Sequence, residues 1–140
     1  MKIVYYYDEN LKFCPVKEYF KNYLLNENDS DSVIRRKQKI LADIDAKINY
    51  IKDNGARPIP PISKPLRGYS FFEILSPKDF KTVIRILYFR YQDKMVLLHV
   101  FEKPASYSTN REKKRVNEQN KIADSFLDIF KLNLENYEEY

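Results

Sequence analysis

The pattern of hydrophobic positions predicts a helical first part of the chain. Residues 2–7 are β-branched and aromatic, which indicates a short first strand. A helix can begin at Pro15, because proline is tolerated in the first turn, and apolar residues recur at helical spacing from there to about residue 26. A second helix is expected to run from a cap at Asp29 or Ser30 to a stop at Gly55, with one apolar stripe formed by Ile34, Leu41, Ile44, Ile48 and Ile51.

The pattern changes from helical to strand-like after residue 55. Residues 56–65 contain four prolines, which remove backbone donors, so we expect an extended connector rather than an element. Three strand candidates follow at residues 69–75, 82–91 and 95–103, joined by short polar connections. Consecutive strands with short connections predict an antiparallel meander.

The strand at residues 82–91 is apolar on both faces, which is typical of a central strand covered on both sides. In the next strand, strict alternation places Met95, Leu97, His99, Phe101 and Lys103 on one face. Val96, Leu98, Val100 and Glu102 then fall on the other face.

The end of the chain predicts one more helix. Residues 106–110 form a capping loop, and a helix from about residue 111 to 130 carries apolar residues in its second half that can dock on the sheet. The tail from Leu132 is expected to fray or to extend this helix. The expected organisation is one α+β domain: strand and helical hairpin (1–55), connector (56–65), antiparallel strands (66–104), and C-terminal helix with an acidic tail (108–140).

Composition narrows the class of protein. The single cysteine, Cys14, cannot form an intramolecular disulfide, so we expect a cytoplasmic protein. One histidine and one cysteine do not make an ordinary zinc site, and no metal or cofactor is expected. Residues 81–115 carry nine Lys or Arg and three Asp or Glu, whereas residues 116–140 carry two and six. A basic segment beside an acidic tail favours a polyanionic partner.

Three residues are candidates for catalysis. Arg85 lies in the middle of a buried run, and a buried guanidinium needs either an ion-pair partner such as Glu73 or a phosphate ligand. Lys103 ends its strand, where sites on sheets are often assembled, and His99 is either a hydrogen-bonded core residue or a proton-transfer group.

Aromatic and basic residues are candidates for binding RNA. Tyrosines such as Tyr88, Tyr91 and Tyr107 are able to stack bases, and cations at the start of the last helix are able to contact phosphates. The expected RNA-binding set is Arg67, Tyr88, Arg90, Tyr107, Arg111, Lys113, Lys114 and Arg115.

Several of these segments, taken in order, resemble a known family. They are residues 64–68 (KPLRG), 72–73 (FE), 84–89 (IRILYF) and 97–103 (LLHVFEK), followed by a helix that Thr109 introduces. The set is similar to the HigB-like, phage-derived branch of the RelE toxin superfamily. The resemblance implies a RelE-like fold, in which the N-terminal helical hairpin packs on a twisted antiparallel sheet with a C-terminal helix.

The resemblance also implies a function: a type II toxin that cleaves mRNA on the ribosome without a metal. Its partner would be a cognate antitoxin, often a helix-turn-helix protein of the HigA kind, and no membrane is involved. Arg85 and Lys103 correspond to the family's arginine and first strand-end lysine. Leu75 and Pro104 stand where the family often has further cations. A non-catalytic module that binds RNA, the ribosome or an antitoxin therefore stays open, as does a purely structural role for the Arg85–Glu73 pair.

Overall fold

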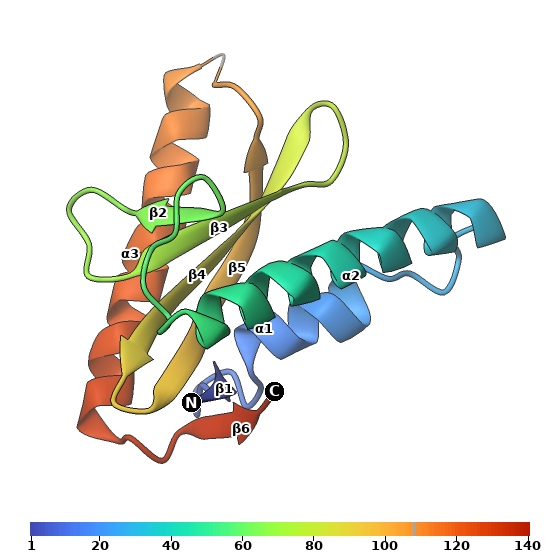
Figure 1. The fold of residues 1–140 in the computed structure, drawn as a ribbon. Helices are drawn as coiled ribbons and strands as arrows, with labels where there is room; N and C mark the ends of the chain where they lie inside the picture. The colour runs from blue at the N-terminus through green and yellow to red at the C-terminus, as the bar shows by residue number, and fades with distance from the viewer. Residues whose placement is uncertain (108) are drawn as a thin grey trace.

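A twisted six-stranded sheet forms the centre of the molecule in the computed structural model, which describes residues 1–107 and 109–140 (Figure 1). In spatial order its strands are β2 (Ser63–Pro65), β3 (Phe72–Pro77), β4 (Thr82–Tyr91), β5 (Lys94–Pro104), β1 (Lys2–Tyr6) and β6 (Tyr137–Glu139). The strands from β2 to β5 form an antiparallel meander, while β1 pairs parallel to β5 and β6 pairs antiparallel to β1. The predicted α+β class and meander are thus present.

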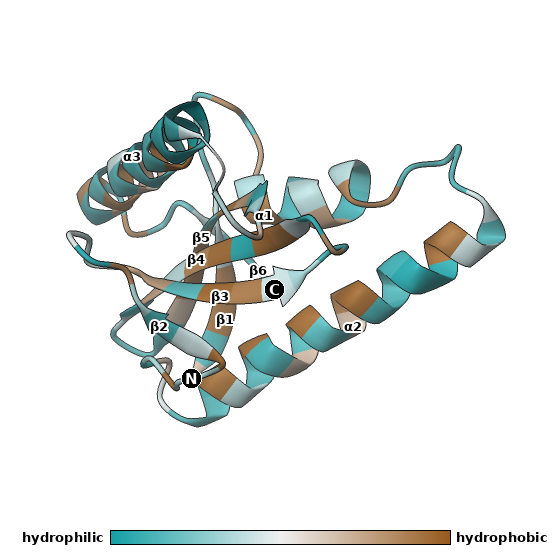
Figure 2. Cartoon of the chain, turned by 90° about the horizontal axis from the view of Figure 1, so that it is seen from above, coloured by the Kyte–Doolittle hydropathy of each residue, from teal (hydrophilic) through white to brown (hydrophobic). Residues whose placement is uncertain are grey.

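Helices cover both faces of this sheet, as Figures 1 and 2 show. On one face lie α1 (Pro15–Glu18), its π-helical continuation η1 (Tyr19–Tyr23) and the long helix α2 (Asp31–Asp53). On the other face lies α3 (Asn110–Leu132). The N-terminal part of α2 projects beyond the sheet, and the buried residues of this helix all lie in its second half.

Local sequence explains where the two long helices begin. Ser30 accepts the backbone N–H of Val33, and Thr109 accepts that of Glu112, so each helix has a hydroxyl cap. Gly55 follows α2 with a φ of 90°, a backbone conformation that ends the helix and that glycine adopts without strain. The expected first helix is different: after one α-helical turn it widens, and the N–H of Leu24 bonds to the carbonyl of Tyr19.

Two hydrophobic cores share the sheet. The core under α1 and α2 includes Ile44, Ile48 and Ile51 of α2 packed on Ile84 and Ile86 of β4. The core under α3 includes Ala123, Phe126 and Phe130 of that helix packed on Leu87 and Phe89 of the same strand. β4 is therefore covered on both sides, as its two apolar faces predict.

A bulge in β5 makes the predicted face assignment of this strand wrong. The pairing with β4 shifts by one residue between the Leu87–His99 and Tyr88–Leu97 pairs, so Leu98 has no partner of its own. Met95 and Leu97 consequently join the core under α1 and α2, whereas Phe101 joins the core under α3. An extra residue reverses the alternation, which strict period-two counting does not anticipate.

Two short strands were also absent from the prediction. β2 lies inside the proline-rich segment expected to be a connector; it is an edge strand, where a missing backbone donor is tolerated. β6 lies in the tail that was expected to fray or to continue the helix. At Asn133 the backbone leaves helical geometry with φ −146° and ψ 97°, and the chain turns back to pair with β1.

Ion pairs hold the C-terminal strand in place. Lys2 lies 3.0 Å from Glu139, and Lys17 lies 3.0 Å from Glu138. The carboxylate of Glu138 also accepts the Cys14 thiol at 3.1 Å, and the hydroxyl of Tyr140 donates to Asp45 on α2. Among the described residues, none of the helices has the length and apolar character required to cross a membrane.

Candidate functional site

A buried ion pair crosses from β3 to β4 on the face covered by α3. Arg85 Nε lies 2.7 Å from Glu73 Oε2, and the two residues are only 7% and 2% exposed. The register explains the contact, since Arg85 lies opposite Leu75 and Glu73 is the next residue of β3 on that face. The atoms are close but do not form a regular hydrogen bond. The structure therefore contains the ion pair that the sequence offered as the structural alternative for Arg85.

Neighbouring groups fix both members of this pair. Lys64 on β2 brings its ammonium 3.4 Å from Glu73 Oε1, so the carboxylate lies between two cations. Arg85 Nη1 donates to Asn120 Oδ1 of α3 at 3.4 Å, and the guanidinium lies 5.7 Å from the centre of the Phe101 ring. The Arg85 side chain is thus contacted from β3, from β5 and from α3, and these contacts restrict its rotamers.

Lys103 adds an unbalanced positive charge to this cluster. It lies opposite Val83, two residues from Arg85 along β4, and is only 9% exposed. Its ammonium lies 5.0 Å from the centre of the Tyr107 ring, and the salt bridges found in residues 1–107 and 109–140 do not include it. Burial and then the charge of Arg85 lower its pKa, against an opposing effect of Glu73.

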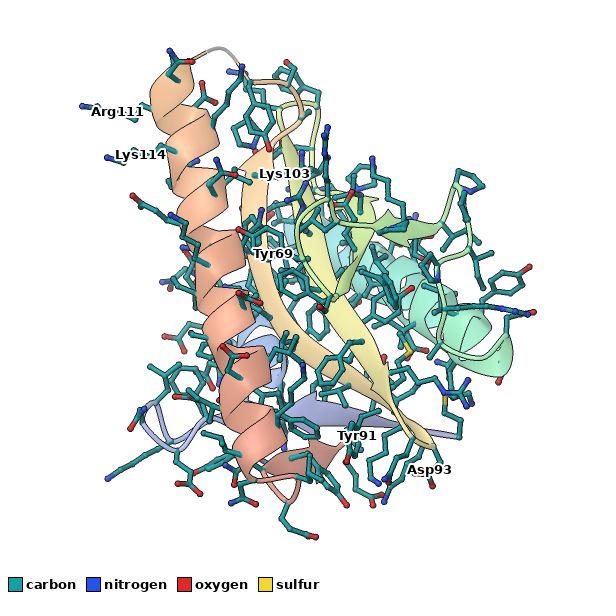
Figure 3. The ribbon with its side chains drawn as sticks, turned by 90° about the vertical axis from the view of Figure 1, so that its left-hand side faces the viewer. Tyr69, Tyr91, Asp93, Lys103, Arg111 and Lys114 are labelled. Carbon is teal, nitrogen blue, oxygen red and sulfur yellow. The ribbon has the colours of Figure 1, made fainter. Side chains whose placement is uncertain are left out.

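The cluster of Lys64, Glu73, Arg85 and Lys103 therefore contains three cations and one carboxylate. Such a surplus favours binding of an anion, because a phosphate would restore charge balance in a partly desolvated place. Figure 3 shows Lys103 beside α3, on the sheet face that this helix covers. A lysine with a lowered pKa is also a better proton donor than an ordinary one.

His99 lies on the same face as these cations but directs its hydrogen bond to α3. Its Nε2 forms a 2.9 Å hydrogen bond with Gln119 of α3, its ring meets Phe126 edge-on at 5.4 Å, and its Nδ1 is buried without a hydrogen-bond partner. Burial lowers the pKa of this imidazole, although the Gln119 hydrogen bond opposes that effect. His99 precedes Lys103 by four residues, roughly 13 Å along a strand, with Phe101 between them. His99 lies opposite Leu87 and is therefore, like Lys103, two residues from Arg85 along β4, but its Nε2 is engaged by Gln119 and not by the cations.

A groove runs along β5 between α1 and η1 on one side and α3 on the other. It has a volume of about 1130 Å³, and both His99 and Lys103 line it. The parallel pairing of β1 with β5 ends at Leu97, so no other strand in the described part of the chain covers the outer edge of β5 beyond that point. Arg115 and Lys81 line the same groove, which places further cations near its Lys103 end.

Two of the expected RNA-binding residues do not fit that role. Tyr88 has no exposed surface and lies on the opposite face, where its hydroxyl donates to Ser63 Oγ at 2.8 Å. A ring without exposed surface cannot stack a base, so this prediction is wrong. Arg90 lies at the far end of the sheet and donates to the backbone carbonyls of Gln92 and Gly55. Tyr91 is near that end too, as Figure 3 shows.

The remaining expected RNA-binding residues are exposed but lie on different sides. Tyr107 is 38% exposed and contacts Lys103. Arg111 and Lys114 project from the side of α3 that faces away from Lys103 (Figure 3). Arg67, Lys113 and Arg115 are all exposed, and Arg115 alone of these three lines the groove.

Two residues that contact the ion pair, Lys64 and Asn120, were not among the predicted site residues. Lys64 is on the unexpected strand β2, so no pattern indicated its direction. Asn120 carried a signal: it shares the buried face of α3 with Val116, Ala123 and Leu127, where a polar side chain is out of place. A polar residue in an apolar helical stripe indicates a buried polar partner on the facing sheet.

Neither a metal-ligand cluster in residues 1–107 and 109–140 nor a comparison with known proteins assigns a role to the site. Within the described residues, no group of three His, Cys, Asp or Glu side chains is placed to hold a metal ion. No protein-family model, no curated protein and no solved structure matches this chain.

Proposed function

We propose that this chain is a HigB-like toxin of a type II toxin–antitoxin system, a RelE-superfamily endoribonuclease that cleaves mRNA on the ribosome without a metal. The observation that carries the proposal is the mostly buried Lys103, a cation beside the Arg85–Glu73 pair that forms no salt bridge with the residues the structure describes. Its support from sequence is the ordered resemblance of residues 64–109 to that family.

The proposed reaction is attack of a ribose 2′-oxygen on the adjacent phosphorus. The 2′-hydroxyl gives its proton to solvent water, a new P–O bond forms, and the bond to the 5′-oxygen breaks as that oxygen gains a proton. Negative charge develops on the phosphate oxygens during this step, and fixed cations such as Lys103 and Arg85 stabilise it. Lys103, with its lowered pKa, is the better placed proton donor to the leaving oxygen, because the Nε2 of His99 is engaged by Gln119 and its Nδ1 is buried.

The proposal assigns substrate positioning to the ribosome. The cluster contains only a few groups, and placing the 2′-oxygen in line with the phosphorus lowers the barrier without further side chains. The partner that neutralises such a toxin would be a cognate antitoxin of the helix-turn-helix, HigA-like kind.

One observation favours a second candidate, a non-catalytic module of the same fold that binds RNA, the ribosome or an antitoxin. Arg85 already faces a carboxylate at 2.7 Å, and the residue opposite it on β3 is the apolar Leu75. Pro104 follows Lys103, so the strand end carries one cation and not two. Such a site has fewer cations to stabilise the charge that develops during cleavage, but it still has cations that bind a phosphate.

Inducible expression of the wild type and of Lys103→Met distinguishes the two candidates. Methionine keeps an unbranched side chain and removes the charge, and it leaves no carboxylate without its partner. Lys94→Met is the matched control, since Lys94 is a partly buried lysine at the other end of the same strand.

If the chain is a toxin, the wild type and Lys94→Met should arrest growth and produce discrete mRNA cuts, which primer extension detects. Lys103→Met is expected to lose cleavage by roughly 100-fold or more, which is the usual effect of removing an acid–base group. Folded wild-type protein that neither arrests growth nor cuts mRNA would contradict the catalytic proposal and favour the binding module.

A further inference from the structure

The turn between β3 and β4 presents an almost fully exposed phenylalanine that the proposed reaction does not use. Phe80 is 87% exposed, although phenylalanine has no polar atom that would favour water. Single exposed apolar residues are common on protein surfaces, so exposure alone decides nothing. The ring of Phe80, however, projects from an ordered turn and lies beside a lysine ammonium.

The turn holds Phe80 in a defined position. Asp79 Oδ1 accepts the backbone N–H groups of Lys81 and Thr82 at 2.8 and 2.9 Å. The carbonyl of Thr82 accepts the N–H groups of Lys78 and Asp79. These bonds close the turn on both sides of Phe80, so its ring projects from a fixed backbone.

A cation accompanies the ring. The ammonium of Lys81 lies 5.3 Å from the centre of the Phe80 ring. Lys78 is neutralised by Glu102 at 2.8 Å, whereas the ion pairs identified among the described residues do not include Lys81. The turn therefore offers an exposed π-face together with one available positive charge.

A second aromatic–cation pair lies beside the turn, with Tyr107 on the adjoining loop and the mostly buried Lys103 at the end of β5. Tyr107 is 38% exposed, and the ammonium of Lys103 lies 5.0 Å from its ring centre. The N–H of Ala105 donates to the carbonyl of Lys81 at 2.8 Å, which ties this loop to the β3–β4 turn. Figure 1 shows the turn and the loop at the same end of the sheet.

We infer that this end of the sheet is a stacking platform for single-stranded RNA, with Phe80 and Tyr107 receiving bases and Lys81 and Lys103 contacting the phosphates between or beside them. Aromatic faces with interleaved cations match the two repeating features of a single strand, its unstacked bases and its phosphates. An apolar peptide would use the rings but would leave the lysines without a partner. Lys81, Lys103 and Arg115 line the same groove, which also favours a polyanion.

The inference rests on the proposed function for its choice of RNA as the ligand, and it adds Phe80 and Lys81 to the binding surface. The chain has no tryptophan, so Phe80→Trp creates a single fluorescent reporter at the platform. Leu132→Trp is the matched control, because Leu132 is 88% exposed and lies at the end of α3, away from this turn. The probe is a single-stranded RNA with 2′-O-methyl riboses, which cannot be cleaved by 2′-oxygen attack, titrated at low salt.

We expect saturable quenching of the tryptophan in Phe80→Trp and none in Leu132→Trp. A duplex of the same sequence is expected not to quench, because its bases are already stacked. In anisotropy titrations with the labelled strand, Phe80→Ala should weaken binding by roughly 10- to 100-fold and Phe80→Tyr should restore it. Lys81→Met should reduce the slope of log affinity against log salt by about one.

Equal quenching of the two tryptophan variants, quenching by the duplex as strong as by the single strand, or unchanged affinity of Phe80→Ala would each overturn the platform. Quenching of the tryptophan by an uncharged apolar peptide but not by the RNA strand would overturn it in favour of a protein partner. Cleavage by the wild type without quenching at Phe80→Trp refutes the platform and leaves the proposed enzyme in place. Quenching without any cleavage on the ribosome supports the platform and refutes the enzyme.

Discussion

Glu73 and Arg85 are both buried, and the charge of each is balanced mainly by the other. Lys64 is mostly exposed and Arg85 is buried, so the guanidinium of Arg85 offsets most of the cost of burying the charged Glu73 carboxylate. A buried charge that loses its partner is strongly destabilising, whereas removal of both charges can be neutral. The pair therefore has a structural role whether or not Arg85 also contacts a phosphate.

Substitution of this pair has a predictable effect on stability. Arg85→Ala should lower the free energy of unfolding by roughly 3–5 kcal/mol, because Glu73 keeps its buried charge. The double variant Glu73→Leu/Arg85→Met should recover most of that loss. Urea unfolding followed by circular dichroism checks both values. A single variant as stable as the wild type would mean that the ion pair does not form in solution.

A pH effect is expected from His99. Because burial lowers its pKa in the folded protein, the unfolded chain takes up a proton below about pH 6.5 that the folded chain does not bind. Stability should therefore fall as the pH drops through that value, and the loss should stop below the folded pKa. His99→Phe removes the titrating group, so urea unfolding at pH 7.5 and 5.5 should show a smaller decrease for the variant. Equal decreases in the two proteins would contradict a buried neutral imidazole.

At the scale of single elements, the sequence predicts those whose pattern is long and regular. The cap of α2 at Ser30, its apolar stripe from Leu41 to Ile51 and the two-sided strand β4 all follow from local spacing, whereas Ile34, predicted in the same stripe, does not join the core. The bulge at Leu98 does not, since one extra residue in β5 reverses which face each later side chain meets without any change in composition. That reversal directs His99, Phe101 and Lys103 toward α3.

The C-terminal strand β6 shows why a short edge strand escapes prediction. Its three residues carry no pattern of their own, and it forms because Glu138, Glu139 and Tyr140 find partners far away in the sequence. The contact of Glu138 with Cys14 has a chemical consequence. Burial first, and then the Glu138 hydrogen bond, raise the pKa of the Cys14 thiol to about 12.

Removal of residues 137–140 should therefore make Cys14 reactive. The wild-type thiol is buried and protonated at neutral pH, so iodoacetamide should alkylate it slowly in the folded state. The truncated chain should react at least several times faster, and both should react equally in urea. Equal rates in the folded proteins would show that β6 does not cover Cys14 in solution.

At the scale of the whole molecule, two layers of helices cover one sheet, and the candidate site lies where α3 meets the strands. Sequence reasoning placed Arg85 and Lys103 on neighbouring strands, because antiparallel pairing follows from the short connection between them. It could not find Lys64 or Asn120, whose positions depend on how β2 and α3 pack. Nor could it give the contact of His99 with Gln119, which depends on how α3 packs. The two apolar faces of β4 do indicate that Tyr88 is buried, so its place in the RNA-binding set did not follow from the pattern.

Primer extension on one mRNA in a reconstituted translation reaction measures the proposed cleavage itself. Purified wild-type protein, Lys103→Met and Lys94→Met are compared on the mRNA alone and on the mRNA engaged by ribosomes. We expect discrete cuts by the wild type and by Lys94→Met on ribosome-bound mRNA, with cleavage by Lys103→Met reduced roughly 100-fold. Absence of cuts by the folded wild type, or equal cutting by Lys103→Met, would contradict it.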